Sequence, residues 1–184
     1  MLKAGVRLAT IATGVLKQRR TLLICLISKK DEIEGVLSTK IVVDGDDASA
    51  SIIKMIKKSR FATQVKLLVS NGISIAGLNV LDVPLLEKEL HIRFISITRK
   101  KPNPTALIGA IRSFGTQNKV DTKTKERKVV WAKTLKQYRT HGFYMQTPLT
   151  KSELELFAGD AAKLIRLAHI IARGVSTSES KNRV

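Results

Sequence analysis

The stretch that decides the fold is residues 39–56, which read TKIVVDGDDASASIIKMI. Its first part, Thr39–Asp44, has the β-branched residues typical of a strand, and the Gly45-Asp46-Asp47 triplet that follows is typical of a turn. From Ala48 to Ser59 the apolar residues recur at helical spacing, with Asp46 or Asp47 in the position of a helix N-cap. These residues therefore predict a strand that leads directly into a helix.

Apolar segments on both sides of this corner predict an α/β fold. Upstream, Val6–Thr13 and Thr21–Ile27 are predicted strands, and the residues between them are few enough for a hairpin. Two hairpin-linked strands followed by alternating strands and helices predict one domain over residues 1–184, with a mixed five-stranded sheet and flanking helices. The elements predicted downstream are strand Val65–Val69, helix Val80–Leu90, strand Ile92–Ile97, helix Thr105–Phe114, strand Gly142–Gln146, a helix capped by Thr150 and Glu153, and helix Asp160–Arg173.

The composition indicates a folded protein with a polyanionic partner. Hydrophobic residues make up 43% of the 184 residues, enough to bury a core, and no apolar run reaches the roughly 18 residues that span a bilayer. The single cysteine, Cys25, lies in an apolar run, which predicts a buried thiol and excludes a disulfide framework. Lys and Arg number 33 against 15 Asp and Glu, a net charge of +18. We therefore expect a cytoplasmic protein that binds DNA or RNA rather than a membrane, although some thermophilic proteins are simply rich in lysine.

A basic segment around residues 117–139 is the most direct candidate for contact with a phosphate backbone. Its Lys and Arg residues are opposed only by Asp121 and Glu126, which predicts an exposed inserted loop followed by an amphipathic segment around Trp131. Basic side chains bind phosphates by releasing condensed counterions, and Trp131 or Tyr138 would stack on an unpaired base. The alternative is a solvated lysine-rich face with Trp131 in the core. Together with the patch after the preceding strand, the candidate nucleic-acid contacts are Lys100, Lys101, Lys123, Lys125, Arg127 and Lys128.

Three stretches of the sequence together resemble a known family. They read KIVVDGDDAS at 40–49, NGISIAGLNVLD at 71–82 and LIRLAHIIA at 164–172. In this order and spacing they resemble the archaeal domain-of-unknown-function 99 family, also called endonuclease dU, over nearly the whole chain. That family is similar to endonuclease V, so the resemblance implies a ribonuclease H-like fold. It also implies cleavage of a strand near a deaminated base, with Mg²⁺ held by carboxylates.

The carboxylates that this resemblance requires are only partly present. Asp44, Asp46 and Asp47 stand where the second acidic ligand of such folds lies, so they are the candidate metal ligands and catalytic residues. Their alternative role is an Asx turn with a helix N-cap. The first strand, where the family has a pair of acids, carries Ala12 and Thr13 instead. An alanine cannot bind a cation, and a neutral hydroxyl is a poor substitute for a carboxylate.

Further polar residues are candidates for the same site. Asp82 is a candidate catalytic ligand within a helix, with a solvated or capping carboxylate as the alternative. Arg166 and His169 lie three residues apart on one helix face and match the family's C-terminal motif. There they would contact phosphate or assist proton transfer, while a packed helix histidine is the alternative. After the fourth strand, Ser70 and Asn71 replace a further metal-binding aspartate.

Two functions remain open on the sequence. The first is nucleic-acid binding by an endonuclease V-like domain with residual or lost Mg²⁺-dependent nuclease activity. The second is a non-catalytic binding or scaffold subunit that has lost the metal site. The replacement of the acidic pair by Ala12 and Thr13 favours a protein that is not an enzyme.

Overall fold

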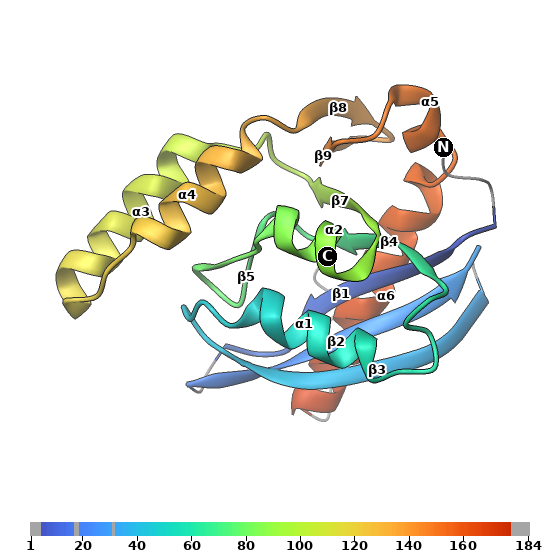
Figure 1. Ribbon diagram of the computed structural model, residues 1–184, viewed down its shortest axis with the longest axis horizontal. Coiled ribbons are helices and arrows are strands. Elements are labelled where there is room, and N and C mark those ends of the chain that lie inside the picture. Colours follow the sequence, from blue (N-terminus) through green and yellow to red (C-terminus); the bar gives the residue numbers. More distant parts are fainter. Residues whose placement is uncertain (1–4, 17–18, 31, 178–184) are drawn as a thin grey trace.

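The computed structural model of the protein describes residues 5–16, 19–30 and 32–177, and these form a twisted sheet with helices on both faces (Figure 1). The strands of the main sheet are β1 Arg7–Thr13, β2 Arg20–Lys29, β3 Glu32–Val42, β4 Val65–Ser70, β7 Arg93–Thr98, β8 Lys136–Thr140 and β9 Phe143–Thr147. Their order across the sheet is β3-β2-β1-β4-β7-β9-β8. Because β1, β4 and β7 are parallel neighbours, their carboxyl ends meet at one edge of the sheet.

The described residues contain more strands than the five-stranded prediction. The hairpin of β1 and β2 is confirmed, with Ile11 opposite Cys25, and burial raises the pKa of the Cys25 thiol to about 12. The parallel strands and the predicted Gly142–Gln146 strand are also present. The additional strand β8 pairs with β9 at the edge of the sheet and leaves most of its side chains exposed. It was not predicted because an exposed edge strand lacks the apolar alternation by which strands are recognised.

One face of the sheet is covered by α1 Ala48–Lys57, α2 Val83–Leu90 and a small hairpin of β5 Ser74–Ile75 and β6 Asn79–Val80 (Figure 1). Ile52 and Ile56 of α1 and Leu86 of α2 are fully buried against the sheet, where Phe94 is one of the largest buried side chains. The predicted helix after residue 79 begins later than expected, because residues 79–80 pair with β5 first.

The opposite face is covered by α6 Ala158–Thr177, which follows the short helix α5 Lys151–Glu155 and its predicted capping box (Figure 1). Small residues allow α6 to approach the sheet closely: Ala168 and Ala172 pack in one buried cluster with Ala12 of β1. The position where the sequence resemblance implied a metal-binding acid is therefore a helix contact, and Ala12 is only 3% exposed. Among the described helices, none is long and apolar enough to cross a membrane.

Helices α3 Pro104–Asn118 and α4 Lys123–Ala132 form an antiparallel hairpin that projects beyond the sheet, the α3–α4 arm (Figure 1). The predicted exposed loop in the basic segment is shorter than expected, because α4 already begins at Lys123. The amphipathic segment predicted around Trp131 is the end of this helix. The turn of the arm is tight: Lys119 has a left-handed backbone, and a Cβ at Gly115 would lie 2.5 Å from the Thr122 side chain. Trp131 is half-buried and packs against the main core, as the alternative interpretation of the segment expected.

Candidate functional site

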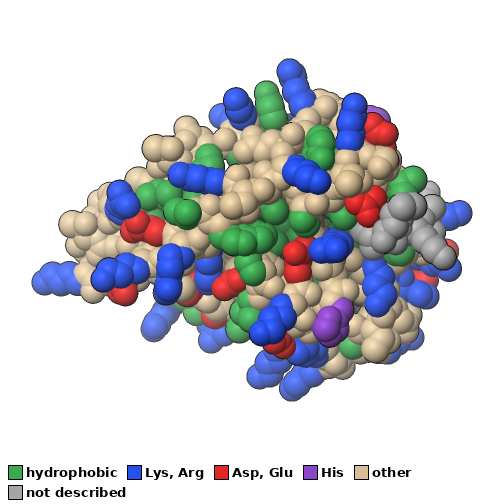
Figure 2. All heavy atoms as spheres, turned by 45° about the horizontal axis from the view of Figure 1, so that its top comes forward, with side chains coloured by type: hydrophobic (Ala, Val, Ile, Leu, Met, Phe, Trp, Pro, Cys, Tyr) green, Lys and Arg blue, Asp and Glu red, His purple; other side chains and the backbone are tan. Residues whose placement is uncertain are grey.

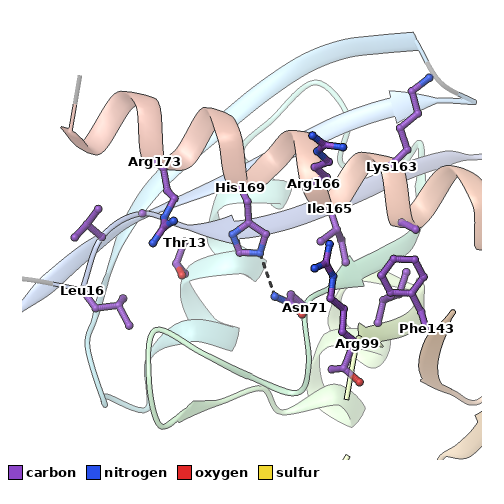
Figure 3. A pocket seen from close by; sticks show the side chains of 15 residues that line it. Thr13, Leu16, Asn71, Arg99, Phe143, Lys163, Ile165, Arg166, His169 and Arg173 are labelled. Carbon is purple, nitrogen blue, oxygen red and sulfur yellow. Dashed lines mark hydrogen bonds between the residues drawn. The ribbon is translucent and has the colours of Figure 1, made fainter. Parts of the chain in front are cut away.

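A cavity of about 740 Å³, the strand-end pocket, lies where the parallel strands of the sheet end (Figure 3). Thr13 ends β1, Asn71 follows β4 and Arg99 follows β7, while α6 and Phe143 form the other walls. Loops at the carboxyl ends of parallel strands are where α/β proteins usually bind ligands, because several chain segments converge there. Of the residues predicted for the site, this pocket brings together Arg166 and His169.

His169 is held by the residue that follows β4. Its Nε2 lies 3.2 Å from the side-chain nitrogen of Asn71, the contact that Figure 3 draws between α6 and the strand ends. An amide nitrogen only donates, so the imidazole accepts here and keeps its own proton on Nδ1. Burial and, secondarily, the neighbouring Arg173 lower the pKa of His169. Both observations describe a neutral histidine near pH 7.

The lining of the strand-end pocket is basic. Its charged residues are Arg99 from the end of β7 and Lys163, Arg166 and Arg173 from α6, and among the described residues no Asp or Glu lines it. No described carboxylate forms an ion pair with Arg166 or Arg173. The positive charges of Arg166 and Arg173 face one cavity, and a bound anion would relieve the repulsion between them. The pocket therefore suits a phosphate or carboxylate ligand.

The Asp44–Asp47 corner lies apart from this pocket, and its three carboxylates have separate partners in the protein. Asp44, in a left-handed conformation, accepts a hydrogen bond from Leu78 N at 2.8 Å. Asp46 forms an ion pair with Lys128, with 2.6 Å between Oδ1 and Nζ. Among the described residues, no group of three or more His, Cys, Asp or Glu side chains is placed to hold a metal ion.

Asp47 occupies the N-cap position of α1, but its side chain does not cap the helix. It accepts hydrogen bonds from Val42 N and from the side-chain nitrogen of Asn79 instead, and the oxygen of Asn79 accepts from Ala48 N. The Asx turn and N-cap expected at Asp47 are therefore replaced by hydrogen bonds that link the end of β3, the start of α1 and β6. Asp82 is the N-cap of α2, accepting from Leu85 N at 3.1 Å, so its capping interpretation is confirmed.

The predicted basic contacts are distributed over different surfaces. Lys125 is buried: it donates to the backbone carbonyl of Asp44 and lies 5.2 Å from the centre of the Phe114 ring. Burial lowers the pKa of Lys125. Lys128 is paired with Asp46, so Lys125 and Lys128 both connect the α3–α4 arm to the Asp44–Asp47 corner. The prediction that these two lysines lie in an exposed loop is therefore wrong. Figure 2 shows Lys and Arg side chains over both the arm and the body of the molecule.

The other predicted contacts are exposed. Lys123 and Arg127 line an open depression on α4 beside Trp131, and Lys100 and Lys101 follow β7 outside the strand-end pocket. The sequence prediction included neither Lys163 nor Arg173 as site residues. Arg173 had a usable signal, since it follows His169 by four residues and so lies on the same face of the helix. Nothing in a single sequence indicates that this face meets the ends of three strands.

We expect Asp47→Ala to destabilise the fold by about 1–3 kcal/mol. The reason is that Val42 N would lose its side-chain acceptor and an unsatisfied donor costs about that much, while the Asn79 side-chain nitrogen keeps its hydrogen bond to Val42 O. Asp46→Asn in the same corner is the control, with an expected change below about 1 kcal/mol for its partly exposed ion pair. Urea unfolding measures both variants. Equal losses would contradict a structural role specific to Asp47.

The titration of His169 provides a second test. Because its pKa is lowered in the folded state, the unfolded chain takes up a proton first as the pH falls below about 6.5. His169 therefore destabilises the fold progressively below that pH, and not above it. In an NMR titration we expect a pKa below the ordinary histidine value, which Arg173→Ala moves upward by removing the neighbouring charge. An ordinary value that the variant leaves unchanged would contradict the described environment.

Comparison with known structures defines the class of fold first. Human ENDOV is 10% identical to this chain, with a TM-score of 0.53 over 91% of this chain and 83% of its own, which shows the fold alone: ribonuclease H-like, as predicted. A protein of unknown function from Archaeoglobus fulgidus is 25% identical, with a TM-score of 0.76 over 92% of this chain and 98% of its own.

Sequence comparison then gives the family. A UPF0215 protein of Nanoarchaeum equitans is 33% identical over 165 residues, which cover 88% of this chain and 82% of that protein. The profile described as Endonuclease dU matches residues 4–176. The chain belongs to the Endonuclease dU family, which confirms the resemblance seen in the sequence.

Proposed function

We propose that this protein binds nucleic acid by holding backbone phosphates in the strand-end pocket, through its own side chains. One observation carries the proposal: a cavity at the strand ends is lined by Arg99, Lys163, Arg166 and Arg173, with no Asp or Glu among its described lining residues. Arginine guanidinium groups match phosphate oxygens in geometry and charge, and such bonds are stronger than neutral ones. The net charge of +18 would attract a polyanion over longer distances.

Each pocket residue has a distinct part in this proposal. Arg166 and Arg173 lie on either side of His169 along α6, so they would contact the phosphate oxygens of a strand that follows the helix. Neutral His169 has one remaining N–H donor, on Nδ1, because its other nitrogen accepts from Asn71. Asn71 is thus a positioning residue that fixes the imidazole.

The residues present do not fit a carboxylate-held Mg²⁺. Magnesium prefers hard, charged oxygen ligands, but the strand-end pocket offers only the Thr13 hydroxyl and the Asn71 amide where the family pattern has acids. The carboxylates of the Asp44–Asp47 corner accept hydrogen bonds from Leu78, Lys128 and Asn79. We therefore propose phosphate binding by side chains and derive no metal-dependent step.

A salt titration of oligonucleotide binding tests this function. Phosphate contacts release counterions, so the logarithm of the affinity should fall linearly with the logarithm of the salt concentration, by about 0.7 per phosphate on single strands. Phosphates carry no base information, so strands that differ only in sequence context should share one slope. An affinity independent of salt would contradict the proposal.

A further inference from the structure

The two outer strands of the main sheet differ in how far they are protected from pairing with another strand. At one edge, β8 carries the exposed side chains of Lys136 and Arg139, and like charges of this kind discourage pairing. The other edge is β3, which lies at the bottom of the sheet in Figure 1. Within β3, the stretch Gly35–Thr39 contains no charge and no proline. We call this stretch the open edge, because an unprotected edge can accept a further strand.

The backbone groups of the open edge point away from the sheet at every second residue. Just beyond β3, Val43 N donates to Arg19 O, and the residues bonded across an antiparallel pair alternate along each strand. The odd-numbered residues of β3 from Gly35 onward therefore bond to β2, and Val36 and Ser38 face outward. Within the described residues, the backbone groups of Val36 and Ser38 have no hydrogen-bond partner.

The protein's own side chains mark both ends of the open edge. The carbonyl oxygen of Glu34, just before it, accepts a hydrogen bond from Arg60. The carbonyl oxygen of Lys40, just after it, accepts one from Arg20. The outward backbone groups between these two carbonyls are left for a strand from outside.

The side chain at the start of the open edge is apolar and accessible. Val36 lies opposite Leu26 of β2, which is fully buried in the cluster that Ala168 and Ala172 of α6 complete. Residues opposite each other in a sheet share a face, but Val36 is 50% exposed. A strand added beside β3 would extend this face and remove apolar surface of Val36 from water.

The charges near the two ends of β3 indicate which strand would be added. Glu32 and Lys40 are both exposed, and each lies four residues from Val36 in the chain. If two copies of β3 pair in antiparallel fashion about a two-fold axis at Val36, each Lys40 lies near Glu32 of the partner subunit, and opposite charges across strands stabilise a sheet. A parallel arrangement would bring like charges together.

We propose that the protein forms a symmetric dimer through β3, in which the two main sheets continue into each other across two antiparallel β3 strands. The outward backbone groups of Val36 pair with those of Val36 of the partner subunit. No described residue of β3 lines the strand-end pocket, so the dimer leaves both pockets open. Antiparallel pairing points the two pockets in opposite directions, so one dimer would bind two separate strands of nucleic acid.

Sedimentation velocity of the full chain tests the dimer, at protein concentrations from about 1 to 100 µM and in about 0.3 M salt, which screens the net charge of +18. The native protein should reach twice the 20.3 kDa of one chain at the upper concentrations. Ser38→Pro removes an outward N–H without removing a bond to β2, and it should weaken dimerisation at least about tenfold. Ser38→Ala is the matched control: it keeps this N–H, so its dimerisation should stay within about threefold of the native value.

Two results would overturn the dimer. One is a native protein that remains monomeric at 100 µM, and the other is a dimer that Ser38→Pro leaves intact, because another surface would then form it. If Ser38→Pro does not fold, Val36→Lys takes its place, since it sets two like charges opposite each other at the axis. Gln137→Lys, which adds the same charge on β8, is its control, and equal dimerisation of these two variants would also overturn the proposal.

Discussion

Replacing Arg166 and Arg173 together by alanine should weaken oligonucleotide binding about 100-fold. Both side chains are exposed and line the strand-end pocket from α6, where each would donate to a phosphate oxygen. A hydrogen bond to a charged partner is worth about 1.5–3 kcal/mol, and the lower value is appropriate at an exposed site. The salt dependence on single strands should also flatten by about one to one and a half units, for two phosphates no longer neutralised.

The control is Lys123→Ala with Arg127→Ala on α4, which removes the same charge from an exposed surface outside the strand-end pocket. We expect this variant to lose less than about threefold in affinity. Filter binding at several salt concentrations, with thermal melting to confirm folding, measures both variants. If the α4 variant loses more affinity than the α6 variant, the main nucleic-acid contact is the α3–α4 arm, and the proposed site is wrong.

Introducing the family's acid at the first strand, Ala12→Asp, should destabilise the protein by about 3–5 kcal/mol. Ala12 is 3% exposed and packs against Ala168 and Ala172, so a carboxylate there would be buried without a partner. Burying an unpaired charge costs several kcal/mol. The loss should shrink as the pH falls and the carboxyl group becomes neutral, which urea unfolding at pH 7 and at pH 4.5 would measure relative to the native chain.

Thr13→Asp is the matched control one residue further along β1. Thr13 is half-buried and lines the strand-end pocket, so an aspartate there faces basic side chains and should change stability by less than about 1 kcal/mol. The same change should weaken oligonucleotide binding, because it places a negative charge in the phosphate site. A stable, folded Ala12→Asp protein would mean that α6 does not pack on β1 as described.

Much of the fold could be predicted because its central strands are strongly patterned. The continuous apolar run around Cys25 predicts a buried strand, residues 39–56 predict a strand followed by a helix, and both are found. Helix α3 was also predicted, but strand β8 and the packing of α4 against α3 could not be predicted in the same way. Their stability comes from tertiary contacts, such as Lys125 on the Asp44 carbonyl, which bring together residues 81 positions apart in the chain.

The candidate site was predicted in part. Arg166 and His169 share a helix face, and the structure places that face at the strand ends. The acidic triplet was predicted as a metal site because carboxylates are scarce in this chain. Local spacing does not reveal whether the three side chains point at one ion or at separate donors. Asp47, for example, accepts a hydrogen bond from Asn79, which lies 32 residues away in the chain and so outside any local pattern.

The central claim is that side chains alone, without a divalent cation, hold the phosphate. The most direct measurement is the affinity of the native protein for uracil- and inosine-containing strands in chelator and in Mg²⁺ or Mn²⁺ at matched ionic strength, with each sample then resolved on a denaturing gel. We predict equal affinity within about threefold under all conditions and intact strands throughout. Binding that requires the metal, or metal-dependent cleavage that the chelator abolishes, would contradict the account.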